Sequence, residues 1–224
     1  MADTPRDQWW QLTRHSPTPA ERPAGTGATV FSSFDLAQLT DEAWRLHCQR
    51  LGPAPQWLGH WDQALHTARD LRAAHGSVAR LVHAVDRAEL WLSLRAPSAP
   101  PARIVLTARL GSWPDYHAKR WHRASYRRGS PHYEGQVRHE GLLVDGTLGR
   151  VWESDTANVL MVKDGLWYTP DPARGPLLHG TTLRTVMARR AVVTADLTLD
   201  QLRAADQIWI CNALLGLQRA QLAA

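Results

Sequence analysis

The sequence predicts an α+β fold of two domains with mixed, mostly antiparallel sheets. The 224 residues, 44% of them hydrophobic, are enough for one large or two small domains with buried cores. Pairs of alternating apolar runs are joined by turn dipeptides, which is typical of antiparallel strands, and a few runs have helical spacing. Residues 111–117 combine turn-forming residues with no periodicity, so we place the junction between the domains there.

Four segments follow from this division. Residues 1–26, rich in Pro, Thr, Arg and Gly, show no sustained periodicity and are expected to form an irregular N-terminal arm. Residues 27–110 form the smaller α/β domain, and residues 118–224 form the larger domain after the interdomain loop 111–117. No internal repeat is evident, which argues against solenoids and propellers.

The smaller domain is expected to begin with a strand in ATVFSSFDL. A helix follows in LTDEAWRLHCQRLG, capped by Thr40 or Asp41 and closed by Gly52. Apolar residues at spacings of three and four predict a second helix over residues 56–75. Two alternating runs on either side of Asp86-Arg87 predict a hairpin, and ARIVLTARL predicts one more strand.

The larger domain is rich in strand signals. The dipeptides Asp145-Gly146 and Asp164-Gly165 are each flanked by apolar alternation, which is the pattern of a β-turn between strands. A helix is expected to open at Thr181 or Thr182. The remaining expected elements are a strand in AVVTADL, a short helix in LTLDQLRAAD and a closing strand in QIWICNALLGL.

The net charge of +5 comes almost entirely from arginine, since only Lys119 and Lys163 among the 26 basic residues are lysines. The arginines are spread over nearly every segment, whereas binding to phosphate backbones needs clustered charge, so we expect no nucleic-acid partner. No apolar run approaches the ~18 residues that a membrane span needs. Residues 1–15 lack the basic and apolar regions of a signal peptide, so we expect a cytoplasmic protein without a membrane partner.

Cysteine and histidine usage bears on metal sites. Cys48 and Cys211 cannot form a disulfide framework or supply the four thiolates of a structural zinc site, and a reducing compartment fits them. No pair of histidines combines His-x-x-x-His spacing in a helical pattern with a nearby Glu. We therefore predict no metal site.

The scarcity of lysine limits any lysine-dependent reaction to two positions. Lys163 lies in a VKDG turn, where a side chain is usually solvated. Lys119 is thus the lysine that burial could make a nucleophile and a base. From its spacing alone, a surface lysine is the more frequent interpretation.

Six short motifs occur in a fixed order: GATVFSSF, HCQRL, HAKRWHR, EGLLVDGTLGRVWESDTANVLMVKDGLWYTP, LLHGTT and ADQIWICNAL. Together they resemble the fold-type IV pyridoxal-phosphate (PLP) enzymes, the class IV aminotransferase family that also includes aminodeoxychorismate lyase. The resemblance covers residues 27–217. It implies the two-domain fold of D-amino acid aminotransferase and PLP as cofactor.

The resemblance also implies roles for individual residues. Lys119 matches the family's Schiff-base lysine, and Glu153 matches the carboxylate that faces the pyridine nitrogen. Arg50 resembles the phosphate-binding arginine, which suits a bidentate contact. Without the family context, the sequence around Glu153 is equally consistent with an exposed strand residue, and Arg50 could be a solvated helix residue.

Gly180, Thr181 and Thr182 resemble the family's phosphate loop, where backbone N–H groups at a helix N-terminus hold the anion. A threonine N-cap would have the same geometry. Asn158 falls on the family's asparagine and is a structural or a cofactor contact. His179 and Leu183 depart from the usual proline and arginine around this loop. The family's N-terminal strand with its Asn-Gly turn is not recognisable before residue 27.

Three positions favour the lyase among family members. Residues 31–33 read FSS where aminotransferases commonly have Phe-Glu, and residues 123–124 read RA where branched-chain enzymes have Asn-Tyr. Residues 210–214 read ICNAL in place of a Gly-Thr-Ala turn. We therefore expect conversion of 4-amino-4-deoxychorismate to 4-aminobenzoate and pyruvate, a step of folate precursor synthesis.

Two alternatives stay open. The chain could be a class IV aminotransferase acting on branched-chain or D-amino acids, or a non-catalytic member that keeps the fold. In each enzymatic case the substrate is a small molecule. The family resemblance also implies a homodimer.

Overall fold

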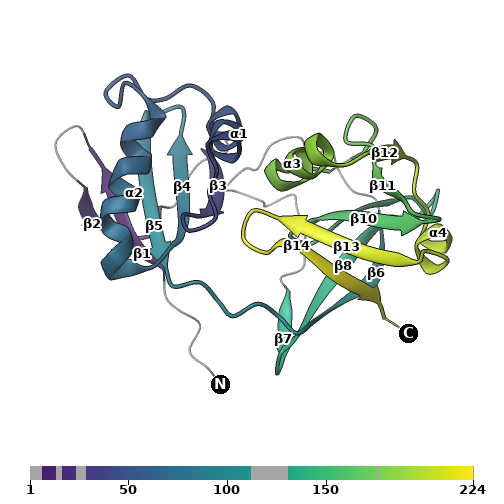
Figure 1. The fold of residues 1–224 in the computed structure, drawn as a ribbon. Helices are drawn as coiled ribbons and strands as arrows, with labels where there is room; N and C mark the ends of the chain where they lie inside the picture. Colours follow the sequence, from purple (N-terminus) through teal and green to yellow (C-terminus); the bar gives the residue numbers. More distant parts are fainter. Residues whose placement is uncertain (1–6, 14–16, 24–28, 112–130, 176, 224) are drawn as a thin grey trace. The chain divides into compact units, whose positions relative to one another are not determined.

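The computed structural model describes residues 7–13, 17–23, 29–111, 131–175 and 177–223. The described chain has fourteen strands and four helices (Figure 1). They are β1 (Gln8–Leu12), β2 (Thr18–Ala20), β3 (Thr29–Asp35), α1 (Asp41–Leu51), α2 (Trp61–His75), β4 (Val78–Ala84), β5 (Glu89–Arg95), β6 (Arg103–Gly111), β7 (His132–Glu134), β8 (Val137–Asp145), β9 (Val151–Ser154), β10 (Asn158–Lys163), β11 (Leu166–Pro170), α3 (Thr181–Arg189), β12 (Val192–Ala195), α4 (Leu199–Arg203), β13 (Gln207–Asn212) and β14 (Gly216–Leu222). No helix among the described residues is long and apolar enough to cross a membrane.

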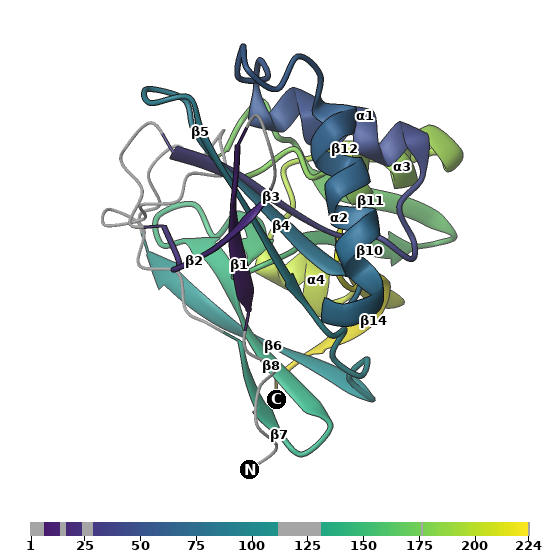
Figure 2. The ribbon, with the colours of Figure 1, turned by 90° about the vertical axis from the view of Figure 1, so that its left-hand side faces the viewer.

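The first compact unit is built on an antiparallel sheet in the order β2-β1-β5-β4-β3. The helices α1 and α2 pack on one face of it and share a core with Phe34, Leu81 and Leu92 (Figures 1 and 2). Helix α1 begins as predicted, because the Thr40 side chain accepts a hydrogen bond from the Ala43 N–H. Exposed charges lie on the outer side of α2.

The N-terminal arm is not irregular where the structure describes it. Strand β1 pairs with β5 along its whole length, and β2 pairs with β1. Trp10 and Leu12 face the core under the helices, whereas Trp9 packs with Phe31 and Trp91 on the opposite face. Trp9 and Trp10 are thus buried on opposite faces of β1. This burial explains why a strand of five residues is stable at this position.

The second unit contains a nine-stranded sheet in the order β12-β11-β10-β13-β14-β6-β8-β7, with β9 pairing to both β10 and β8. The pairings therefore close a ring of six strands, β6, β8, β9, β10, β13 and β14. Side chains inside this ring form a core that includes Leu106, Leu142 and Val159. Closure removes the exposed edges of these strands and fixes β9 between two neighbours.

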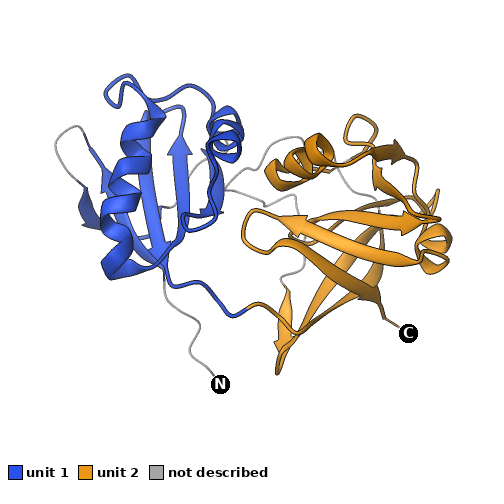
Figure 3. Ribbon diagram, in the orientation of Figure 1, with its two compact units in different colours: residues 1–99, 118–123 blue, residues 100–117, 124–224 orange. Residues whose placement is uncertain are grey.

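The division between the units lies earlier than expected (Figure 3). Unit 1 comprises Met1–Ala99 with Ala118–Arg123, and unit 2 comprises Pro100–His117 with Ala124–Ala224. Strand β6, which we had placed in the smaller domain, pairs in parallel with β8 and β14 of unit 2. Its apolar alternation predicts a strand but does not indicate which sheet it joins, so the junction was misplaced.

Most predicted elements of the second half are present, with two additions. The Asp164-Gly165 dipeptide forms the tight turn between β10 and β11, with both residues at positive φ (52° and 78°). In place of one closing strand, β13 and β14 form a hairpin whose turn, residues 213–215, leads into Gly216 at positive φ (65°). Strand β7, which was not predicted, pairs with β8.

Candidate active site

Glu153 and Asn158 lie side by side where β9 meets β10, since they are direct partners in the antiparallel register. Both are almost fully buried, at 2% and 4% exposure. The Asn158 Nδ2 group donates to Oε2 of Glu153 at 3.4 Å. A buried carboxylate in this position is retained only where fixed donors compensate its lost hydration.

Strand β10 directs Asn158 toward helix α3. Alternate residues Val159 and Met161 point into the ring of strands. Leu160 instead packs against Leu183 of α3 and Cys211 of β13. Because side chains alternate along a strand, Asn158 shares the face of Leu160 that α3 covers.

The segment before α3 is tied to this pair. The Leu178 carbonyl accepts from Asn158 Nδ2 at 2.6 Å, and the Leu178 N–H donates to Glu153 Oε2 at 3.3 Å. Gly180 passes so close to Asn158 that a Cβ at residue 180 would collide with Oδ1 of Asn158. The φ of Gly180 is −61°, a value that suits any residue. Glycine is therefore required by the close approach to Asn158 and not by the backbone conformation.

Gly180 is the N-cap of α3 and provides no side-chain cap. The first helical residue, Thr181, is buried, and Thr182 is half-buried. The helix begins with the Arg184 N–H donating to the Gly180 carbonyl at 3.0 Å. An N-terminus capped by glycine leaves first-turn amides for another acceptor, as the phosphate-loop hypothesis requires.

The loop after Glu153 is held by buried charges that the sequence analysis did not identify. Glu140 accepts from Ser154 Oγ at 2.6 Å and from Thr156 Oγ1 at 2.9 Å. Arg138 donates to the same carboxylate at 2.6 Å. Alternation of Arg138 and Glu140 around His139 in a strand was the available signal, because it places both charges on one face.

A second ion pair supports the same loop. Asp155, 3% exposed, accepts from Arg109 at 2.8 Å and from the Gly141 N–H at 2.8 Å. The Asp155 N–H in turn donates to the Gly141 carbonyl at 2.9 Å. Residues 154–157 are thereby fixed at both ends, which positions Glu153 and Asn158.

Two cysteines are excluded as nucleophiles of this site. Burial raises the pKa of Cys211, the register partner of Asn158, to about 12. In unit 1, burial and the nearby Asp62 carboxylate raise the pKa of Cys48 to about 11. Both groups remain thiols near neutral pH, and only a thiolate would attack.

The remaining two predicted residues are Arg50 and Lys119. Arg50 is half-buried in the last turn of α1, in unit 1. Lys119 lies outside the described residues. The structure therefore brings together Glu153, Asn158, Gly180 and Thr181, with Thr182 next along α3.

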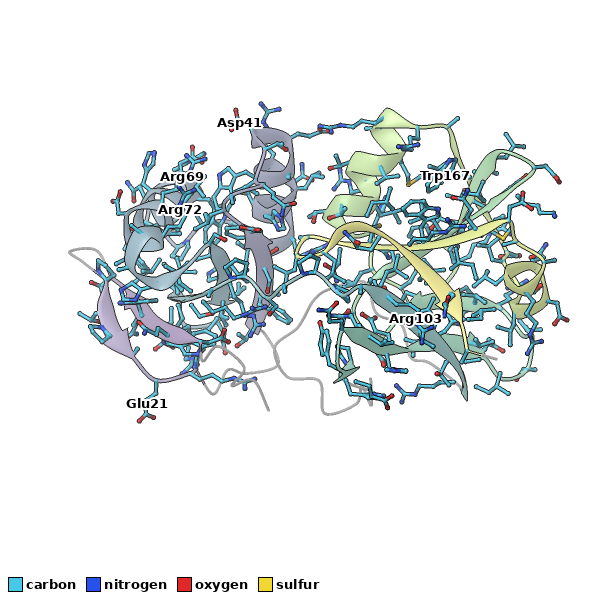
Figure 4. All side chains as sticks on the ribbon, turned by 60° about the horizontal axis from the view of Figure 1, so that its bottom comes forward. Glu21, Asp41, Arg69, Arg72, Arg103 and Trp167 are labelled. Atoms are coloured by element: carbon cyan, nitrogen blue, oxygen red, sulfur yellow. The ribbon has the colours of Figure 1, made fainter. Side chains whose placement is uncertain are left out.

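A groove of about 670 Å³ also lies between α1 and α2. Trp44, Cys48, Trp61 and His66 contribute to its walls, and none of the predicted site residues that the structure describes does. Arg69 and Arg72 are exposed residues of α2, the helix on one side of this groove (Figure 4). The groove is thus not the predicted cofactor site.

Comparison with solved structures identifies the fold. An aminotransferase from Brucella abortus bound to the cofactor PLP is similar with a TM-score of 0.67 and 21% identity, over 96% of this chain and 91% of that one. A fold IV transaminase from Curtobacterium pusillum has a TM-score of 0.66 and 18% identity, over 97% and 92% of the two chains. A 4-amino-4-deoxychorismate lyase from Pseudomonas aeruginosa has a TM-score of 0.64 and 19% identity, over 91% and 87%.

These likenesses confirm the predicted α+β fold of the fold-type IV enzymes. No curated protein sequence matches the chain. The family model for amino-transferase class IV matches residues 43–222, which include all the predicted site residues. The chain therefore belongs to the class IV aminotransferase family.

Proposed function

We propose that this protein is a PLP-dependent lyase that converts 4-amino-4-deoxychorismate into 4-aminobenzoate and pyruvate. Family membership supports both the enzymatic character and the cofactor. Similar structures include a lyase and aminotransferases, so the choice of reaction depends on residues of this chain.

The residues of unit 2 fit PLP. The buried Glu153 carboxylate, oriented by Leu178 and Asn158, would hold a proton on the pyridine nitrogen. The Gly180-capped start of α3 would bind the phosphate through backbone N–H groups, with Thr181 and Thr182 beside it. Asn158 fits a positioning role, because its amide is engaged by Glu153 and the Leu178 carbonyl. For Arg50, which lies in unit 1, the family resemblance is the basis of the proposed phosphate contact.

One observation carries the choice of the lyase. The turn after β13 is built by Asn212, whose Oδ1 accepts from the N–H groups of Leu214 and Leu215 at 2.9 and 2.8 Å. Its Nδ2 donates to the Thr156 carbonyl at 3.3 Å, in the loop that follows Glu153. A Gly-Thr-Ala turn, usual in the transaminases, has no amide side chain, and a threonine hydroxyl forms such turn bonds more weakly.

The first strand of the resemblance adds support. Ser32 is buried and lies 2.6 Å from Nδ1 of His47, and Ser33 accepts from Arg80 at 3.1 Å. The hydroxyl pair at residues 32–33 is thus fully engaged within unit 1. A glutamate at residue 32, as in the aminotransferase pattern, would be a buried charge against His47.

In the proposed reaction the Lys119 amine removes the proton from the substrate carbon that bears the amino group. PLP, when bound, supplies the sink for the electron pair that this step releases. Glu153 keeps its negative charge next to the ring nitrogen throughout. The bond between the adjacent ring carbon and the enolpyruvyl oxygen then breaks, and the carbon ring becomes aromatic. The released enol takes up the proton held by Lys119 and tautomerises to pyruvate. The atoms of the substrate are all accounted for in the two products, so no amino acceptor enters.

The test is incubation of the purified holoenzyme with 4-amino-4-deoxychorismate in the absence of any keto acid. Release of pyruvate and 4-aminobenzoate in equal amounts supports the proposal. Parallel incubations with branched-chain or D-amino acids plus 2-oxoglutarate test the aminotransferase alternative. Glutamate formation in these parallel incubations, with no pyruvate released from 4-amino-4-deoxychorismate, would contradict the lyase proposal.

A protein that takes up no PLP would be a non-catalytic member. Glu153→Gln tests the proposed role of this carboxylate, and its turnover should be reduced on the order of 10²-fold.

We also propose that the enzyme is a homodimer in the cytoplasm. Cys48 and Cys211 are both free, which fits a reducing compartment. Resemblance to the family is the basis for the dimer.

A further inference from the structure

The β7–β8 hairpin brings two histidines and a glutamate to one face. His132 is the direct antiparallel partner of His139, and Glu134 lies two residues after His132. Residues two apart on a strand point to the same side, as do directly opposed partners. The three side chains therefore share one face of the hairpin, although the sequence separates the histidines by six residues.

The distances within this group resemble those of a metal site. The imidazole rings of His132 and His139 are stacked, with centroids 4.7 Å apart and planes 9° from parallel. The Nε2 atoms of both rings face the Glu134 carboxylate, at 3.7 Å for His132 and 3.5 Å for His139. All three ligand atoms lie within 4.8 Å of one another.

Tetrahedral zinc places neighbouring ligand atoms at about 3.3–3.5 Å, because each bond is about 2.0–2.2 Å long. The two imidazole–carboxylate distances are close to this range and too long for hydrogen bonds. Because the two rings are stacked nearly parallel, their Nε2 lone pairs do not converge on one point, and coordination requires the His132 ring to turn relative to His139. The His132 and Glu134 side chains are 66% and 71% exposed, so they have room for this turn.

His139 provides an independent indication of a ligand. Its Nε2 atom is buried and has no hydrogen-bond partner among the described residues, although the imidazole as a whole is 22% exposed. A buried polar atom without a partner is costly, so such an atom needs an explanation. The atom is directed at the Glu134 carboxylate, where a cation between the two groups would satisfy it.

The opposite face of the hairpin fixes its register. Tyr133 and Arg138 are the next paired residues after His132 and His139, and their side chains lie on this opposite face. Arg138 donates to the Tyr133 hydroxyl at 2.6 Å. Arg138 is in turn bound to the buried Glu140. His139 is thereby held by a strand that is anchored on its other face, which is how a site is preorganised.

We propose that His132, Glu134 and His139 bind a divalent first-row metal ion of the zinc class. Two imidazoles and one carboxylate are ligands that Zn²⁺ accepts readily, and three protein ligands leave a fourth position for water or a small anion. The helical His-x-x-x-His pattern is absent because strand pairing, and not helical spacing, assembles the ligands. This site uses none of the residues assigned to PLP and does not depend on the proposed reaction.

The test is titration of the purified, chelator-treated holoenzyme with Zn²⁺ by isothermal calorimetry at pH 7.5. We expect one site whose affinity falls at least tenfold in His139→Gln and in Glu134→Gln. His66→Gln, which alters an exposed histidine of α2, is the matched control and should bind Zn²⁺ like the wild type. Zn²⁺ should also raise the Tm of the wild type and of His66→Gln, but not of the two ligand variants.

Glu134→Gln keeps the test decisive if His139→Gln fails to fold, because Glu134 is exposed and its amide replacement is nearly the same size. Equal Zn²⁺ affinity in Glu134→Gln and the wild type would overturn the proposal. Failure of the wild type to bind Zn²⁺ would overturn it as well. Either outcome leaves the lyase assay unaffected, so failure of this site and failure of the proposed function are distinguishable.

Discussion

At the scale of single residues, the contact between Gly180 and Asn158 determines how α3 approaches the strands. Gly180→Ala places a methyl group against Oδ1 of Asn158 at a backbone conformation that alanine accepts. We therefore expect a purely steric loss of about 1–3 kcal/mol in the free energy of unfolding. Urea unfolding of the two proteins measures it.

A double variant separates this collision from other effects. Asn158→Ala by itself removes the donor to the Leu178 carbonyl and should also destabilise the protein. In Gly180→Ala/Asn158→Ala the collision is absent, so the combined loss should be smaller than the sum of the single losses by about 0.5–3 kcal/mol. Simple additivity would contradict the close approach.

The two lysines allow an equally direct prediction. Lys119→Ala should abolish covalent attachment of PLP and turnover, since the other lysine is Lys163. Lys163→Ala should leave both nearly unchanged. Lys163 forms an exposed ion pair with Asp206 at 3.3 Å, and such pairs contribute about 0–1 kcal/mol. Mass spectrometry after borohydride reduction locates the adduct, and a pyridoxyl group on Lys163 would show the assignment to be wrong.

The sequence was informative for site residues that belong to one local motif. The motif around Glu153 and Asn158 predicts their roles, and the structure pairs them in register. The motif does not predict that the backbone of Leu178 binds both side chains, because Leu178 lies twenty residues after Asn158 and contributes only backbone atoms to these contacts. Arg109 was missed for the same reason, since only the parallel pairing of β6 with β8 brings it to Asp155.

At the scale of elements, His83 of β4 links that strand to the end of α1. Its Nδ1 lies 3.1 Å from the Leu51 carbonyl, so the neutral ring carries its proton there and donates it. Trp61 of α2 packs edge-on against the ring at 5.3 Å. Burial lowers the pKa of His83 below 6.5, although the bond to Leu51 opposes part of this shift.

This lowered pKa predicts a pH-dependent stability. The unfolded chain binds a proton at His83 more readily than the folded chain, so protonation favours unfolding. The contribution of neutral His83 is complete above about pH 6.5 and is lost as the pH falls from there toward the lower folded pKa, with a slope of at most about 1.4 kcal/mol per pH unit.

The measurement is a series of urea unfolding curves between pH 7.5 and 5 for the wild type and His83→Asn. Asparagine keeps a donor close to the Leu51 carbonyl but does not titrate, so this variant should lose less stability on acidification. The difference between the two proteins should therefore narrow as the pH falls. Parallel curves would mean that His83 does not titrate differently in the folded and unfolded chains.

Helices and strands were predictable where a capping residue, a turn dipeptide or a regular spacing of apolar residues marks them. Thr40 and Gly52 delimit α1 as expected, and the Asp164-Gly165 turn is present. Helix α2 begins at Trp61, five residues later than expected, because His60 provides its cap. Strands β7 and β14 were missed, since one has three residues and the other is largely polar, and both form because a neighbouring strand pairs with them.

At the scale of the whole molecule, strand order was beyond the reach of the sequence. Closure of the ring in unit 2 depends on β6 lying between β8 and β14, a parallel arrangement with partners far along the chain. Local patterns carry no signal for such pairings, so the fold class was correct while the junction was misplaced. The family resemblance supplied the architecture that periodicity could not.

The oligomeric state is the prediction at this scale. The family resemblance implies a homodimer with active sites near the subunit contact, so light scattering should give twice the chain mass of 25.1 kDa. A specific interface of this kind buries at least about 1,200 Å². Because association depends on concentration, serial dilution should lower the measured mass and the turnover per chain together. A monomer with undiminished turnover per chain at every concentration would contradict the dimer and would place the complete active site within one chain.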